Sequence, residues 1–492
     1  MSALDWPTFT EEAIDRFKEL LRIPTINPPG NERPAAELCA RVLDREGIAY
    51  EIVEPKPGRA SLVARLRGSG KKRPLLLNGH LDVVPVDREK WTHDPFAAVE
   101  ADGCIWGRGA IDMKNMVTMS LMTLVGLKRE GVKLDRDVIF AAVADEEAGS
   151  REGALHLVEH RPDLVRAEYV LNEVGGHTLH MGAERYYPIQ VAEKGICWFE
   201  ITAEGEPGHG SMPHPGNAVV VLARAIEKIG STRLPQHVTP IVENFLRTLA
   251  SGAPLAQRAV LPLVLKPQLA GFLIGLMRRA DPDQARAIDA LLRNTASPTM
   301  LGAGTKVNVI PSRASAQIDG RTIPGQSVSD FVAEIEKVIG PGLKLRVHEQ
   351  HDGVVFPSET PLYDAITRAV ARHDPGGIAV PYMIPGFTDS FAYARLGAIC
   401  YGFSPVRLGP ELKFTRMYHG HDERIPRDGF AWGLRVLYEL VRDFCGELSD
   451  NRIGNVPRGI GKGFIRAPSA GSPSHASFAA IARTRTFPPS TR

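Results

Sequence analysis

The sequence predicts an α/β fold: a central, mostly parallel sheet flanked by helices, with a second α+β domain inserted into the same chain. Four short apolar runs carry the first part of this prediction, since fully buried parallel strands are apolar on both faces. These runs are 74–77, 138–144, 169–171 and 398–403. Helical stretches alternate with the runs, which indicates helices on both faces of the sheet. The clearest helix covers 113–130 and is predicted to end at Gly131.

The chain of 492 residues is too long for one ordinary core, so more than one domain is expected. The pattern changes near Glu193. Beyond it we expect strands at 197–203, 306–310 and 314–318, and helices at 218–229 and 327–339. We therefore assign 1–193 and 351–446 to the first domain and 194–350 to the inserted one, with a helical insertion at about 232–299. Residues 447–492 are rich in Ser, Pro, Gly and Arg and are predicted to be a mobile, basic tail.

Composition excludes several classes of protein. Apolar residues make up 43% and charged residues 24%, which is the globular range, and the net charge of +2 gives no strong field toward nucleic acid or an anionic membrane. The apolar run 268–277 is too short to cross a bilayer, so no membrane span is expected. The start of the chain has no apolar signal segment. The five cysteines are odd in number and lack CxxC spacing, which favours a cytoplasmic protein without disulfides.

Potential metal ligands follow the predicted strands. The first run leads to His80 and Asp82, and the second to Asp145, Glu146 and Glu147. The third run leads to Glu173, and a glycine-rich turn leads to Asp112 at the start of the helix. Because the functional crevice of an open α/β sheet lies at the carboxyl ends of its strands, these groups can meet there. A histidine with several carboxylates suits Zn²⁺ or another divalent ion.

Other segments add candidates. Of Glu146 and Glu147, which cannot point the same way, one can bind metal while the other acts as a base. The segment 418–423 offers His419 and His421 as a second histidine ligand. In the inserted domain His209 stands between two glycines, Asn308 is placed in a strand, and Arg321 lies near a turn. A guanidinium matches a carboxylate, so Arg321 is a candidate for binding one.

Each motif alone has an ordinary structural explanation. His80 and Asp82 could be a hydrogen-bonded pair, and the Glu146–Glu147 pair could be the solvated start of a helix. Glu173 could cap a helix and Arg321 could form a salt bridge. The metal hypothesis therefore depends on their occurrence together, in order.

The ordered motifs resemble the M20 family of metallopeptidases and deacylases, over about residues 10–445. The matching segments are 79–85, 107–114, 145–147, 172–173, 208–213 and 419–423. The resemblance implies two Zn²⁺ per subunit, with Co²⁺ or Mn²⁺ as substitutes, and a bridging carboxylate at Asp112. It gives His80 and Glu173 to one metal and Glu147 and His419 to the other, since the family spacing His-x-x-Asp-Glu selects His419 over His421.

The resemblance also implies roles beyond the metal ligands. Glu146 would be the general base and acid, and Asp82 would hold the imidazole of His80. The inserted domain would act as a lid and as the interface of a homodimer, and His209 would reach into the partner's site. Arg321 and Asn308 would hold the carboxylate of the substrate.

The implied function is a dinuclear-zinc hydrolase for an amide or peptide bond of an N-acyl amino acid or small peptide with a free carboxylate. The long helical insertion favours the larger carboxypeptidase and N-acyl-amino-acid hydrolase branch over an N-acetylornithine or N-succinyl-diaminopimelate deacylase. A catalytically silent binding protein on the same fold and a dinuclear phosphoesterase remain as alternatives.

Overall fold

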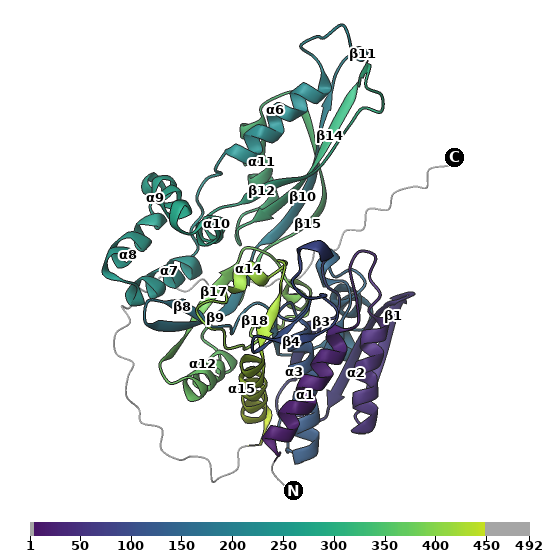
Figure 1. Cartoon of the computed structure of the whole chain (residues 1–492), viewed down its shortest axis with the longest axis vertical. Helices are drawn as coiled ribbons and strands as arrows, with labels where there is room; N and C mark the ends of the chain where they lie inside the picture. The colour runs from purple at the N-terminus through teal and green to yellow at the C-terminus, as the bar shows by residue number, and fades with distance from the viewer. Residues whose placement is uncertain (1–3, 448–492) are drawn as a thin grey trace, which may run out of the picture. The chain divides into compact units, whose positions relative to one another are not determined.

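A computed structural model of the chain describes residues 4–447 (Figure 1). The predicted tail therefore lies outside the described residues, apart from Glu447. Within the described part no helix combines the length and the apolarity that crossing a membrane requires. All five cysteines are buried and free.

The larger sheet is mixed, with a parallel centre. Its main path runs β1-β2-β6-β3-β7-β18-β9-β16, and β8 and β17 pair with β9. The four central strands match the four apolar runs: β3 (Leu75–His80), β6 (Val138–Val143), β7 (Tyr169–Asn172) and β18 (Ile399–Gly402). They pair in parallel and are almost entirely buried, which confirms the α/β prediction.

The outer strands bring antiparallel pairing to both sides of this centre. They are β1 (Tyr50–Lys56), β2 (Arg59–Leu66), β8 (Leu179–Met181), β9 (Glu184–Glu193), β16 (Val354–Val355) and β17 (Gly377–Ile384). A separate three-stranded sheet consists of β4 (Val99–Ala101), β5 (Cys104–Trp106) and β19 (Arg424–Pro426).

Helices cover the large sheet. α3 (Lys114–Glu130) is buried along nearly its whole length and ends at Gly131, whose φ of 59° is the left-handed conformation that glycine favours at a helix end. The other helices here are α1 (Trp6–Leu21), α2 (Arg33–Arg45), α4 (Ala154–His160), α5 (Pro162–Val165), α12 (Pro361–His373), α13 (Ser390–Ala394), α14 (Phe414–Met417) and α15 (Arg427–Cys445). Short 3-10 turns are η1 (Arg88–Lys90) and η2 (Glu146–Ala148).

A second, antiparallel sheet has the order β12-β14-β10-β15. Its strands are β10 (Gly195–Glu204), β12 (Thr295–Ala303), β14 (Arg313–Thr322) and β15 (Leu343–His351). The helices α6 (Ala218–Ser231) and α11 (Val328–Ile339) pack on it and share its own hydrophobic core. A two-stranded ribbon, β11 (Gly208–His209) with β13 (Val309–Ile310), lies at its far tip in Figure 1.

Two predictions about this region are wrong. Of the strand predicted at 306–310 only Val309–Ile310 is formed, and Asn308 lies in the turn before it, exposed to solvent. The chain reverses there, so the alternating Val307 and Val309 side chains point outward instead of into a core. The helical insertion also ends sooner than 299, because β12 already begins at Thr295.

The helical insertion packs against the large sheet. It comprises α7 (Pro240–Gly252), α8 (Leu255–Val260), η3 (Leu261–Leu265), α9 (Pro267–Ala280) and α10 (Pro282–Leu291). Its buried side chains form one cluster with Tyr186 of β9 and Met383 of β17, and Figure 1 shows the helices beside these strands. The domain boundaries at 194 and 350 stay a prediction.

Two helical glycines give a matched test of this packing. A Cβ atom at Gly433 in α15 would overlap the carbonyl oxygen of Pro405, whereas one at Gly230 in α6 would meet open space. Gly433→Ala should therefore destabilise the fold by about 2 kcal/mol or more, because the backbone must move. Gly230→Ala should stabilise it by up to about 1 kcal/mol, the helix-propensity gain. Denaturant unfolding of both variants measures the difference, and an equal effect would contradict the packing at Gly433.

Candidate metal centre

The carboxyl ends of three parallel strands deliver a cluster of acids and a histidine to one edge of the large sheet. His80 is the last residue of β3, Glu146 and Glu147 form η2 after β6, and Glu173 directly follows β7. Asp112 comes from the turn before α3, and His419 from the loop after α14. For the groups that follow the strands, the sequence prediction that they meet follows from strand direction.

Asp112 lies between the two histidines. Its Oδ1 is 3.1 Å from His80 Nε2, and its Oδ2 is 2.9 Å from His419 Nε2. Glu173 Oε2 lies 3.5 Å from the same nitrogen of His80, and Glu147 Oε2 lies 3.1 Å from that of His419. Two sets of three potential ligands therefore share Asp112: His80, Asp112 and Glu173, and Asp112, Glu147 and His419. In each set one ligand atom per residue lies within 4.8 Å of the others.

Glu146 belongs to the cluster but is held differently. It forms a third set with His80 and Glu147. Within residues 4–447, however, its carboxylate makes no ion pair with either histidine, whereas Glu147 contacts His419. His421 is exposed and belongs to none of the three sets.

The carboxylates in this cluster are strongly perturbed. Burial raises the pKa of Glu173 to about 8, and burial together with the charge of Glu173 raises the pKa of Glu146 well above its usual value. Burial and the charge of Asp112 also raise the pKa of Glu147. The pKa of Asp112 alone is lowered: burial opposes its ionisation, but hydrogen bonds from His419 and His80 outweigh that effect. Four close carboxylates beside two histidines make a site that favours added positive charge.

The donor set fits divalent metal ions. Glu147 Oε1 and Glu173 Oε1 are buried and have no hydrogen-bond partner within the described residues. Buried carboxylate oxygens without a partner are costly unless a cation or donor binds them. Imidazole nitrogen and carboxylate oxygen are ligands that zinc, cobalt and manganese accept.

Asp82 contacts His80 and also supports the turn that carries the two glutamates. The backbone carbonyl of Asp82, at 2.9 Å, accepts from His80 Nδ1, while its carboxylate is 3.5 Å from that nitrogen. The carboxylate accepts instead from the backbone N–H groups of Glu146 and Glu147, both at 3.1 Å, and from Asn27 Nδ2 at 2.8 Å. Asp82 therefore orients both the histidine and the turn that carries the two glutamates.

Glu423 is a supporting residue to which the sequence prediction gave no role. Its buried carboxylate accepts from Arg108 Nη1 at 2.7 Å and from the backbone N–H groups of Gly109, Ile111 and Asp112 at 3.0, 2.7 and 3.0 Å. It thereby fixes the turn that presents Asp112. The spacing His-x-x-Asp-Glu contains this residue, but spacing alone does not reveal which donors it meets.

Asp389 is a second supporting residue that the sequence did not reveal. It is buried, and it accepts from Ser150 Oγ at 2.6 Å and from Asn78 Nδ2 at 3.0 Å. Burial raises its pKa to about 6. No local sequence pattern marks it, because its partners lie far from it along the chain.

The candidates from the inserted region lie in two separate places. His209 pairs with Val309 in the ribbon at the tip, and Asn308 is the next residue along, so these two are neighbours. Arg321 lies near the opposite end of β14. This strand has ten residues, which corresponds to about 30 Å at the usual rise. Asn308 and Arg321 of one chain are therefore too far apart to hold the same small molecule.

The guanidinium of Arg321 already forms an ion pair within its own strand. Its Nε and Nη2 donate to the two oxygens of Asp319 at 2.7 and 3.1 Å, and its guanidinium lies 5.1 Å from the ring centre of Phe387. Its Nη1 is buried and has no partner among the described residues. One nitrogen thus remains for a carboxylate.

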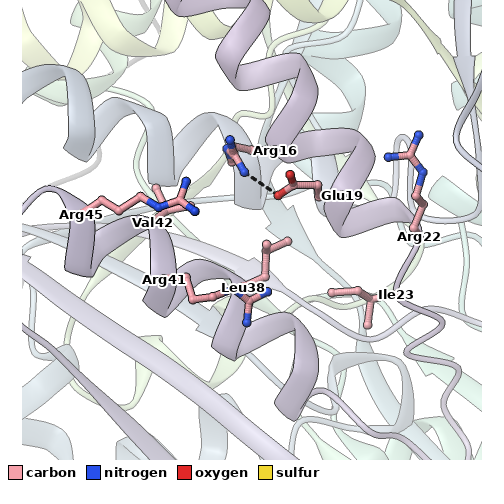
Figure 2. Close-up of a pocket in the computed structure, with 8 residues that line it drawn as sticks. All are labelled: Arg16, Glu19, Arg22, Ile23, Leu38, Arg41, Val42 and Arg45. Carbon is pink, nitrogen blue, oxygen red and sulfur yellow. Dashed lines mark hydrogen bonds and ion pairs between the residues drawn. The ribbon is translucent and has the colours of Figure 1, made fainter.

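A separate hollow of about 360 Å³ lies between α1 and α2 and is lined mainly by arginines (Figure 2). Arg16 pairs there with Glu19 at 2.6 Å, and Arg22 Nε donates to the backbone carbonyl of Ala97 at 3.3 Å. None of the predicted site residues lines it.

Comparisons with known proteins identify relatives of the chain. The family model described as peptidase family M20/M25/M40 matches residues 76–443. A probable carboxypeptidase S-like 2 from Dictyostelium discoideum is 27% identical, covering 78% of this chain and 74% of that protein. The N-fatty-acyl-amino acid synthase/hydrolase PM20D1 of Xenopus tropicalis is 28% identical, with 88% and 86% covered, and human aminoacylase-1 is 26% identical, with 88% and 96% covered.

Solved structures share the fold. The M20 family metallo-carboxypeptidase Sso-CP2 from Sulfolobus solfataricus has a TM-score of 0.67 at 18% identity, with 88% of this chain and 99% of that one covered. Human carnosine dipeptidase 1 has a TM-score of 0.65 at 17% identity, with 89% and 97% covered. A protein from Bacillus subtilis titled a dinuclear metal binding peptidase has a TM-score of 0.55 at 16% identity, with 89% and 98% covered.

Glu423 and its neighbour Asp422 allow a test of the support around Asp112. Glu423→Gln should weaken metal binding about 10- to 100-fold, because an amide cannot accept from all four donors and the turn loosens. It should also destabilise the fold by about 3 kcal/mol, as breaking a buried charge pair does. Asp422→Asn, which changes an acid bonded to Thr92 at the surface, is the control and should change metal binding little. Metal titration and thermal unfolding check both, and equal metal affinity in the two variants would contradict the assigned support.

Proposed function

Because the chain belongs to peptidase family M20/M25/M40, we propose that it is a dinuclear-zinc hydrolase of N-acyl amino acids or small peptides with a free carboxylate. The observation that carries the proposal is the pair of ligand sets sharing Asp112. The names of the relatives support the substrate class, since they include an aminoacylase, an N-fatty-acyl-amino acid synthase/hydrolase and a carboxypeptidase S-like protein.

In this proposal His80, Asp112 and Glu173 hold one zinc, and Asp112, Glu147 and His419 hold the other. Two divalent cations would neutralise the carboxylates, polarise the substrate carbonyl and lower the pKa of a bound water. Cobalt or manganese could replace zinc, because the ligands are the same nitrogen and oxygen donors. The dinuclear title of the related Bacillus subtilis structure supports two ions instead of one.

Glu146 is proposed as the general base and acid. Its carboxylate is buried beside the ligand sets but has no ion pair with either histidine in the described part of the chain. It can therefore take the proton from the attacking water and pass it to the leaving amine. Its raised pKa, caused by burial and by Glu173, suits a group that must hold this proton between the two steps.

The distance between the candidates of the inserted region supports a homodimer. His209 and Asn308 lie together at the tip, about 30 Å from Arg321 along β14, and all three are proposed to act on one substrate. If a second copy supplies His209 and Asn308, they can meet the metal cluster and the Arg321 of the first. Arg321 Nη1 and Asn308 then bind the substrate carboxylate, and His209 donates to the carbonyl oxygen as charge develops there.

Two alternatives from other classes make different predictions. A silent binding protein has no need for the uncoordinated base Glu146, and a dinuclear phosphoesterase has no need for a cationic site for a carboxylate. An N-acetylornithine or N-succinyl-diaminopimelate deacylase would share the reaction but prefer a smaller or more charged substrate.

A substrate panel tests the function directly. With added zinc or cobalt, release of free amine should be seen from N-acyl amino acids or dipeptides and not from their amidated, carboxylate-free analogues, and a phosphodiester should not react. Glu146→Gln is the matched control: it should bind both metals and lose about 10²–10⁴-fold or more of the activity, because only proton transfer is removed. If Glu146→Gln loses metal together with activity, Glu146 is a ligand and Glu147 the base. Turnover of the phosphodiester alone would overturn the proposal.

Subunit mixing tests the proposed dimer. His209→Ala and Glu146→Gln should each be nearly inactive alone. In a mixed dimer, one site combines an intact Glu146 with an intact histidine from the other chain. Random exchange should restore activity to about a quarter of the wild-type value, since half of the dimers are mixed and each holds one competent site.

Glu146→Gln mixed with His80→Ala is the control. Both changes alter groups supplied by the same chain, so no mixed dimer holds a competent site, and no activity should return. Differently tagged subunits confirm the exchange. Absence of recovery in the first mixture, with exchange confirmed, would show that His209 does not act across subunits.

A further inference from the structure

The helical insertion carries an exposed apolar surface that the proposed reaction does not use. On α9, Phe272 is 75% exposed and Leu276 is 52% exposed. Three further exposed leucines lie on the same insertion: Leu255 on α8, Leu263 on η3 and Leu269 on α9. We call these five side chains the α9 patch.

The helix α9 is apolar on both of its faces. Ala270 is buried, and Leu273 and Ile274 are buried in the core that the insertion shares with β9 and β17. Leu269, Phe272 and Leu276, spaced by three and four residues, form a stripe on the other face. A helix that is hydrophobic all round is normally covered all round. Within the described residues, only one face of α9 is covered.

The segment that carries the patch contains cations and no acids, and the acids that follow it, Asp281 and Asp283, are paired with Lys413 and Arg416. From residue 244 to residue 280 the sequence contains no Asp or Glu, although it contains five cations: Arg247, Arg258, Lys266, Arg278 and Arg279. Lys266 lies just before α9, while Arg278 and Arg279 form its last turn. These three are exposed and have no ion pair within residues 4–447. The whole chain is nearly neutral at +2, so this segment is a local concentration of positive charge.

We propose that the α9 patch binds the surface of an anionic phospholipid bilayer. An apolar stripe flanked by cations is the pattern of a helix that lies in the plane of the interface, with its apolar side chains among the acyl chains and its cations at the headgroups. The 14 residues of α9 are too short to cross the bilayer. In this proposal α9 lies along the membrane surface. The net charge of the whole chain does not predict this binding, because the cations are concentrated in one segment.

A second copy of this chain fits the patch less well than lipid does. A symmetric pairing through α9 would place the same patch of both chains face to face. The acid-free segment would then meet itself, and its unpaired cations would face like charges. The acids next to it in the sequence, Asp281 and Asp283, are already paired with Lys413 and Arg416. Anionic headgroups supply the missing opposite charge, at about 1 kcal/mol for each Lys or Arg near the surface.

Vesicle sedimentation tests the proposal with the full chain and without any substrate. Wild type should bind vesicles of phosphatidylcholine mixed with phosphatidylserine, and bind pure phosphatidylcholine at least about ten-fold more weakly. Phe272→Ser/Leu276→Ser and Arg278→Gln/Arg279→Gln should each reduce binding to the mixed vesicles about ten-fold or more. Because all four side chains are exposed, the melting temperature should stay unchanged.

Two controls match these variants in exposure and in charge. Met300→Ser/Leu301→Ser removes two equally exposed apolar side chains from β12. Arg41→Gln/Arg45→Gln removes two exposed arginines from the hollow between α1 and α2 (Figure 2). Both controls should bind the mixed vesicles like wild type.

Several outcomes would overturn the proposal. Absence of binding to the mixed vesicles excludes a lipid-binding surface. If the arginine control loses vesicle binding to the same extent, lipid binds at the hollow between α1 and α2, or binding depends only on the net charge of the protein. Either result contradicts a specific role of the α9 patch. If the patch variants alter the sedimentation coefficient of the free protein but not vesicle binding, the α9 patch is an interface between copies of the chain.

Discussion

The burial of four carboxylates in one cluster is the constraint on which the site depends. Taking even one ion out of water costs several kcal/mol, and like charges at close range add to that cost. The cost shows in the raised pKa values of Glu173, Glu146 and Glu147. Such a cluster persists only where the surrounding fold holds its members in place. Asp112, between two imidazoles, is the member best stabilised as an anion.

Two further acids hold the cluster through backbone donors. Glu423 accepts from three backbone N–H groups of the turn before α3. Asp82 accepts from the N–H groups of Glu146 and Glu147 in η2. A charged acceptor facing several N–H groups is a strong, directional contact, so each turn has one conformation. The proposed metal ligands are thus placed by acids outside the proposed ligand sets, and the precision of the site derives from these turns as much as from the strands.

The sequence was sufficient for the parts of the site that follow from strand direction. Parallel strands end at one edge, so His80, Glu147 and Glu173 could be brought together without coordinates. Asn308 was misplaced because an alternating pattern of valines is typical of a strand, and here the chain turns instead. The hydrogen bonds from the backbone N–H groups of Glu146 and Glu147 to the Asp82 carboxylate were not predicted. These donors lie 64 and 65 positions from Asp82 in the sequence. The helical insertion was recognised, but its packing against β9 and β17 depends on long-range contacts that local periodicity does not carry.

The net charge and apolar content of the whole chain do not describe the helical insertion. A net charge of +2 and an apolar content of 43% describe an ordinary globular protein, yet 37 consecutive residues lack an acid and carry exposed leucines and a phenylalanine. The insertion also packs on strands of the sheet that carries the proposed metal ligands, through Tyr186 and Met383. A lipid-binding surface on the insertion would therefore be held in a fixed position relative to the large sheet. Substrates with long acyl chains gather at lipid surfaces because each buried CH₂ contributes about 0.8 kcal/mol. For a hydrolase of N-acyl amino acids, docking through α9 would raise the local concentration of such substrates without any change in the metal centre.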